Sequence, residues 1–151
     1  MQQQKLVIGV GSPHGDDAVG WRVVDQLATN VPATVQAVAV REPTQILPHL
    51  ADAERVWIID GSRSGGRPGA ITRLEWHAGC LLGDSRASSH GCGVDDVLRL
   101  SSALGYPASN VVIYAIELSE TKPATPLTPE VAAAVTEVTQ RILAEIGCQI
   151  T

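Results

Sequence analysis

The sequence predicts an α/β fold in which helices cover both faces of a mostly parallel sheet, giving three layers. Three short runs rich in β-branched residues, at 5–10, 55–59 and 110–116, lack polar alternation. Such runs are typical of parallel strands buried on both faces. Helical patterns separate them, so strand and helix alternate along the chain. The length of 151 residues fits one domain, which we expect to span residues 1–151.

Two further runs alternate apolar and polar residues. Residues 34–40 alternate as an edge or half-exposed strand does, and residues 70–76 follow a glycine-rich stretch at 61–69. The second of these runs predicts an antiparallel strand at the edge of the sheet. If the strands follow the doubly wound order 2-1-3-4-5, the first and third strands are neighbours and flank the point where ligands bind.

Three segments repeat apolar residues at the helical period and predict helices: residues 17–28, 94–104 and 128–147. Thr128 suits the N-cap of the last helix, Pro129 its first position and Gly147 its end. We expect Pro48 to open a short helix that continues to about residue 53.

The composition excludes several classes of protein. With three Trp, two Tyr and no Phe, the chain has too few rings to build a stacking surface for single-stranded nucleic acid. The net charge of −5 offers no basic stripe to a phosphate backbone. We therefore expect no nucleic-acid partner.

Neither export nor membrane insertion is expected. The apolar stretch at residues 6–11 is too short for the core of a signal peptide or for a membrane span. Cys80, Cys92 and Cys148 form no C-x-x-C pair, so neither a structural zinc site nor a disulfide framework is indicated. A reducing compartment, the cytoplasm, is the expected location.

The first strand ends in the glycine-rich sequence GVGSPHGDDAVG at residues 9–20. Its spacing matches neither the dinucleotide fingerprint nor the phosphate-binding P-loop. Asp16 and Asp17 stand at the start of the following helix, where they suit the helix dipole but repel an anion. A cation is the better ligand for this loop, and simple capping of the helix is the alternative.

Two more candidate ligands follow later strands. Asp60 comes directly after the run at 55–59, at the sheet edge where α/β proteins bind ligands, although it would equally suit the following turn. His90 lies in a loop of small residues before the helix at 94–104, and a surface loop histidine is its alternative interpretation. Together Asp17, Asp60 and His90 predict an open three-ligand site for a borderline divalent metal such as Ni²⁺ or Zn²⁺.

Other catalytic schemes have less support. The chain contains neither a G-x-S-x-G elbow nor an H-E-x-x-H helix. Cys92 stands two residues from His90, too close on one loop to suggest a nucleophile and its base, and a small buried thiol is the preferred interpretation. His14 is either a fourth ligand or a loop residue, and we favour the loop.

These residues together resemble the hydrogenase maturation proteases, which process the large subunit of NiFe hydrogenases. The likeness starts in the loop at 9–20, continues through IID at 58–60 and the S-x-H loop that ends at His90, and finishes in YAIELS at 114–119 and LTPEVAAAV at 127–135. It therefore covers almost the whole chain.

The resemblance implies a twisted, mostly parallel five-stranded sheet between helices, with the family's metal contacts at Asp17, Asp60 and His90. It implies an endopeptidase of the aspartic type that removes the C-terminal extension of the precursor after nickel insertion. Nickel carried by substrate cysteines would be the recognition handle, with Zn²⁺ or Cd²⁺ as substitutes in vitro. Asp17, Asp60 and His90 would complete its coordination, and the metal or a carboxylate-held water would assist hydrolysis.

The sequence departs from the family pattern at Ser12, where Asn is usual, and at Ala18, where Gly is usual. Residues 41–49 lack the Gly-Gly-Thr of some members, which leaves the identity of the hydrogenase open. Two alternative functions remain: a non-catalytic metal-binding or chaperone module that docks the precursor, and a small nucleotide-binding domain. The acids of the glycine loop speak against the second.

Overall fold

The computed structural model describes residues 4–51, 53–77, 80–82, 93–105, 110–119 and 126–147. Its elements, in chain order, are β1 (Gln4–Val10), the 3₁₀ helix η1 (Gly15–Ala18), α1 (Val19–Ala28), β2 (Val35–Val40), the 3₁₀ helix η2 (Pro43–His49), β3 (Ala53–Ser62), β4 (Ile71–His77), β5 (Cys80–Leu82), α2 (Val94–Ala103), β6 (Val111–Glu117) and α3 (Pro129–Ile146).

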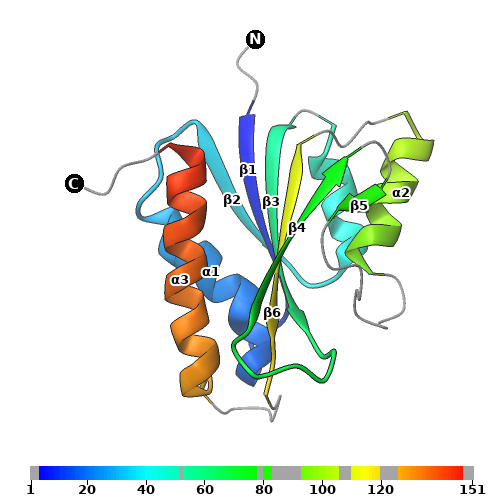
Figure 1. Cartoon of the computed structure of the whole chain (residues 1–151). Helices are drawn as coiled ribbons and strands as arrows, with labels where there is room; N and C mark the ends of the chain where they lie inside the picture. Colours follow the sequence, from blue (N-terminus) through cyan, green and yellow to red (C-terminus); the bar gives the residue numbers. More distant parts are fainter. Residues whose placement is uncertain are drawn as a thin grey trace.

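All described strands belong to one sheet with the order β2-β1-β3-β6-β4-β5 (Figure 1). The strands β2, β1, β3 and β6 are parallel, whereas β4 is antiparallel to both β6 and β5. The predicted α/β fold with a mostly parallel sheet is therefore confirmed. The five predicted strands are all present, and β5 adds three residues beyond β4.

The order of the strands differs from 2-1-3-4-5 on one side of β3. The neighbours β1 and β3 are as predicted, but β6 lies next to β3 and separates it from β4. The burial pattern explains the exchange, because six of the seven residues of β6 are buried and suit an interior position. The antiparallel direction of β4 is as predicted, and β5 takes the edge.

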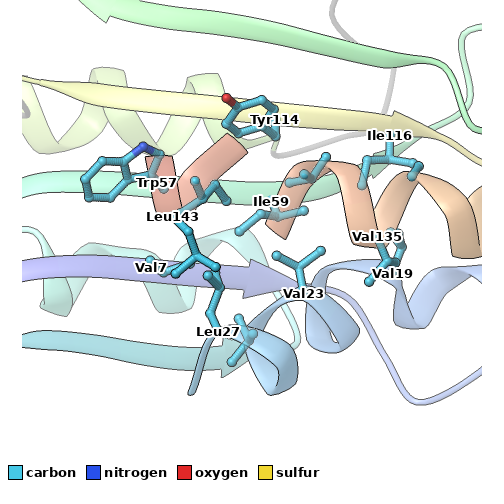
Figure 2. Packing of buried hydrophobic residues seen from close by; sticks show 14 of the residues in the cluster. Val7, Val19, Val23, Leu27, Trp57, Ile59, Tyr114, Ile116, Val135 and Leu143 are labelled. Carbon is cyan, nitrogen blue, oxygen red and sulfur yellow. The ribbon is translucent and has the colours of Figure 1, made fainter. Parts of the chain in front are cut away.

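Helices cover both faces of the sheet, which confirms the three layers. The cluster that contains Val7, Trp57 and Ile59 packs against α1 and α3 (Figures 1 and 2). The neighbouring residues Ile8 and Ile58 belong to the second cluster, which includes residues of α2 and η2. Successive residues of β1 and β3 thus bury opposite faces, which explains why these strands show no polar alternation.

The predicted helices are observed with small differences at their ends. Helix α3 begins after Thr128 and ends at Gly147, whose positive φ of 87° suits glycine. The predicted helix at 17–28 begins with the 3₁₀ turn η1. The short helix expected from Pro48 was wrong, because η2 begins at Pro43 and already ends at His49. Residues Glu42 and Gln45 form its capping box, and this fixes the start upstream of Pro48.

Three glycines let the first helical segment lie directly on the ends of the strands. A Cβ on Gly9 would lie 2.2 Å from the carbonyl oxygen of Gly20, and one on Gly11 would lie 2.2 Å from that of Asp17. A Cβ on Gly20 would lie 2.8 Å from the carbonyl oxygen of Ile59. The glycine-rich loop therefore serves backbone packing, and it brings η1 against the end of β1 and the start of α1 against the ends of β1 and β3.

Helix α3 is tied to the sheet by polar groups near its C-terminus. The Tyr114 hydroxyl of β6 donates to Glu145, and Arg73 of β4 pairs with the same carboxylate. Burial, together with the negative charge of Glu145, raises the pKa of Tyr114 to about 12. Tyr114 therefore stays a neutral donor at physiological pH, and this contact holds α3 in register with β6.

Among the helices in the described part of the chain, none is long and apolar enough to cross a membrane.

We predict that Gly9→Ala lowers the free energy of unfolding by about 3 kcal/mol, because the new Cβ meets backbone that has no room to move. Urea denaturation measures the change. Gly66→Ala is the matched control, since its Cβ would find only contacts of 3.6 Å and should alter stability by less than about 0.5 kcal/mol. Equal stability of the two variants would contradict the close approach.

Candidate functional site

Two of the three predicted site residues lie in the described part of the chain, at the carboxyl ends of neighbouring strands. Asp17 is in η1, which packs on the end of β1, and Asp60 is in β3. Strand β3 continues to Ser62, so Asp60 lies within the strand, opposite Ala115 of β6, and not directly after it. Both carboxylates are half-buried. The sequence placed them at the correct edge of the sheet.

The two carboxylates act on each other electrostatically. Burial raises the pKa of Asp60 to about 7, and the negative charge of Asp17 adds to the increase, while a hydrogen bond from the Gly61 backbone opposes it. Asp17 therefore lies near enough to Asp60 for its charge to act on that carboxyl group. A carboxyl group with this pKa exchanges its proton at neutral pH, which suits acid–base work.

Asp17 is held by the glycine loop itself. The Ser12 hydroxyl donates to its Oδ2 at 2.6 Å, and the Ser12 backbone N–H donates to its carbonyl oxygen at 3.1 Å. The Asp17 N–H donates to the carbonyl oxygen of His14 at 3.1 Å. Ser12 thus supplies a side-chain hydrogen bond to the Asp17 carboxylate.

The sequence did not identify the role of Asp16. Its side chain is fully buried and faces away from solvent, and it accepts hydrogen bonds from the backbone N–H groups of Ser119 and Thr128. These donors are 103 and 112 residues away along the chain, so no local pattern announces them. The only hint in the sequence was that Asp16 directly precedes Asp17, a predicted site residue.

Glu117 is a second buried carboxylate that the sequence did not single out. It accepts hydrogen bonds from the N–H groups of Ser64 and Gly66 and from the Ser64 hydroxyl. Burial alone would raise the pKa of Glu117, but these hydrogen bonds hold it below its ordinary value. The carboxylate thereby fixes the loop that follows Asp60 against the end of β6.

The third predicted ligand, His90, lies outside the described residues, as does Cys92. His14 is exposed in the loop before η1, as favoured from the sequence. Within the residues that the structure describes, no group of three or more His, Cys, Asp or Glu side chains could hold a metal ion. The described chain therefore contributes a pair of carboxylates to this site.

Such a pair fits a cation. Two carboxylates that raise each other's free energy when both are ionised are stabilised by a positive charge between them. Oxygen ligands from only two residues leave most coordination positions open to ligands from other groups. An anionic phosphate, in contrast, would be repelled.

Residues 41–145 match the family model described as hydrogenase maturation protease. No curated protein matches the chain significantly.

Solved structures share the fold over nearly the full chain. A hydrogenase 2 maturation peptidase from a Thaumarchaeota archaeon is 25% identical with a TM-score of 0.73, and the match covers 97% of this chain and 99% of that one. The hydrogenase maturating endopeptidase HybD from E. coli is 23% identical with a TM-score of 0.76, over 95% and 91%. The maturation protease HycI from Thermococcus kodakarensis KOD1 is 19% identical with a TM-score of 0.72, over 94% and 91%.

We predict that Asp60→Asn stabilises the protein above pH 7 but not at pH 4. In the folded chain the pKa of Asp60 is about 7, against 3.8 for the unperturbed group. The folded state therefore binds the proton more tightly, so the wild type loses stability as the pH rises from about 4 to about 7. We expect the variant to gain about 2 kcal/mol at pH 8, after discounting for solvent screening.

Urea denaturation at pH 4 and at pH 8 measures this difference. The control is Asp25→Asn on the exposed face of α1, which should change stability by less than about 0.5 kcal/mol at both pH values. A gain for Asp60→Asn of equal size at both pH values would show that Asp60 is not protonated in the folded state.

Proposed function

Because the chain belongs to the hydrogenase maturation protease family, a family of peptide hydrolases, we propose that it removes the C-terminal extension of a NiFe hydrogenase large-subunit precursor. The observation that supports this activity is the electrostatically coupled pair Asp17 and Asp60 at the carboxyl edge of the sheet. The cysteine composition favours a reaction in the cytoplasm.

We propose that nickel enters the reaction with the substrate. Asp17, Asp60 and His90 would complete the coordination of a nickel ion that cysteine thiolates of the precursor already hold. The pair of carboxylates fits this role, because repulsion between them is relieved by a cation and because the pair leaves coordination positions open. The site would then bind the precursor only after nickel insertion, and recognition of the metal would serve as the check on maturation.

The proposed hydrolysis uses the same residues. Coordination fixes the scissile peptide beside the two carboxylates and so replaces a bimolecular encounter by a positioned one. The bound nickel supplies Lewis-acid polarisation of the peptide carbonyl.

We assign the attack on the carbonyl carbon to a water held by one of the two carboxylates. This carboxylate takes a proton from the water, the C–N bond breaks, and the proton passes to the leaving amine.

A neighbouring function, docking of the precursor without cleavage, uses the same residues. It differs in one observable, since only the peptidase reduces the mass of the precursor. The experiment below therefore separates the two.

We predict that Asp17→Asn, Asp60→Asn and His90→Ala each slow cleavage of the nickel-loaded precursor by about 100-fold or more, because each misplaces the scissile peptide. Mass spectrometry of the precursor over time measures the rate. Asp25→Asn, an exposed carboxylate of α1, is the matched control and should cleave at the wild-type rate. Undiminished cleavage by the three variants would refute the site, and a precursor that the wild type binds but never shortens would identify a docking module.

We predict that Cd²⁺ binds more tightly as the pH rises to about 7 and that its affinity then levels off. Since the pKa of Asp60 is about 7, the metal must displace a proton from it below this pH, which weakens binding about tenfold per pH unit. Calorimetric titrations between pH 5.5 and pH 8 measure the affinity.

His90→Ala is the control for the imidazole. The pH dependence that remains in this variant belongs to Asp60, and affinity that is constant across this range would contradict its role as a ligand.

A further inference from the structure

We infer that Asp16 is a positioning residue for Asp17: its buried carboxylate joins the turn η1 to the end of β6 and the start of α3, and thereby fixes the site carboxylate on the adjacent residue. This inference deepens the proposed function and rests on it, since Asp17 matters as a ligand only if the site binds metal. The positioning itself can be measured without metal.

The two adjacent aspartates are in opposite surroundings. Asp17 is half-buried and its charge raises the pKa of Asp60, whereas Asp16 is fully buried. A buried carboxylate is tolerated only when donors replace its hydration. Asp16 meets this condition through protein groups, and so it is built into the fold and is not available to a ligand.

The donors come from two other elements. The Thr128 N–H donates to Oδ1 at 2.8 Å, and the Ser119 N–H donates to Oδ2 at 3.0 Å. The Thr128 hydroxyl adds a bond to Oδ2 at 3.1 Å. Each oxygen of Asp16 therefore accepts a backbone N–H, and hydrogen bonds to a charged acceptor are stronger than neutral ones.

The Thr128 hydroxyl bonds to Asp16 in place of capping its own helix, α3. Thr128 occupies the N-cap position of α3, but its hydroxyl makes no bond to the first turn of its own helix. The hydroxyl bonds to Asp16 instead. The carboxylate in turn lies at the positive end of the helix dipole of α3, which stabilises its charge.

Because Asp16 and Asp17 are adjacent in the short turn η1, the bonds that fix Asp16 also limit the position of Asp17. In a 3₁₀ turn each residue is rotated by about 120° from the one before, so a fixed Asp16 directs its neighbour to another side of the turn. On that side Ser12 bonds to both the carbonyl oxygen and the carboxylate of Asp17. Asp16 and Ser12 thus hold η1 from two directions.

Three variants test the inference. Asp16→Asn keeps the shape but turns an NH₂ group toward an N–H donor, so it loses bonds to charge and gains a repulsive contact. Thr128→Val removes only the hydroxyl and keeps the N–H donor, so it folds even if Asp16→Asn does not. Thr128→Ser keeps the hydroxyl and should restore wild-type behaviour.

Hydrogen exchange followed by NMR gives a readout independent of metal. The Ser12 and Asp17 amides, which are bonded within the loop, should exchange about ten-fold faster or more in Asp16→Asn and by a smaller factor in Thr128→Val. The Ile58 amide in the sheet interior reports global unfolding, and its exchange should accelerate by a clearly smaller factor than that of the Ser12 and Asp17 amides. Asp25→Asn controls for the loss of one negative charge.

Calorimetry with Cd²⁺ then gives the functional readout, and we expect affinity to fall about tenfold in Asp16→Asn, to fall less in Thr128→Val and to keep the wild-type value in Thr128→Ser. Wild-type exchange at Ser12 and Asp17 in both Asp16→Asn and Thr128→Val would overturn the inference. Acceleration at Ile58 equal to that at Asp17 would also overturn it, because Asp16 would then serve only global stability. If the wild type binds no Cd²⁺, the proposed metal site fails, while the exchange rates still decide the positioning.

Discussion

The carboxyl ends of β1 and β3 are in direct backbone contact with η1 and α1, and the rest of the site depends on this contact. Because Gly9, Gly11 and Gly20 have no Cβ, the first helical segment approaches the strands more closely than a side chain would allow. This approach fixes where Asp17 emerges relative to Asp60 of β3. Main-chain packing therefore sets the relative positions of Asp17 and Asp60 without a ligand. The side chains of the loop only adjust these positions.

Two buried carboxylates extend this arrangement around the edge of the sheet. Asp16 joins η1 to Ser119 and Thr128, and Glu117 joins the loop after β3 to the end of β6. Both accept backbone N–H groups, so both fix main chain and not merely side chains. The acidity of this edge thus has two separate uses. Asp16 and Glu117 fix the main chain at this edge, while Asp17 and Asp60 remain half-buried and the pKa of Asp60 is raised.

The parts of the fold that sequence could predict are those set by local pattern. Apolar runs predicted β1, β3 and β6, because a strand that is buried on both faces contains few polar residues. Helical periodicity predicted α2 and α3, because a helix that is buried on one face repeats apolar residues at the helical period. The insertion of β6 beside β3 could not be predicted, since strand order depends on contacts between distant segments. The same reason hid Asp16, whose donors are more than a hundred residues away. Asp17 and Asp60 were identifiable because Asp17 belongs to the glycine-rich loop after an apolar run and Asp60 directly follows another such run.

The position of β6 has a consequence for how the chain is made. Strand β4 emerges from the ribosome before β6, although β6 is the strand that joins it to the rest of the sheet. In the described sheet β4 pairs with β5 and β6 alone, so its edge toward β6 stays unpaired until about forty more residues are synthesised. Pairing across such a separation closes a long loop and is slow. Completion of the sheet is therefore a late event in biogenesis, and the site edge is assembled only when the C-terminal third of the chain has been released.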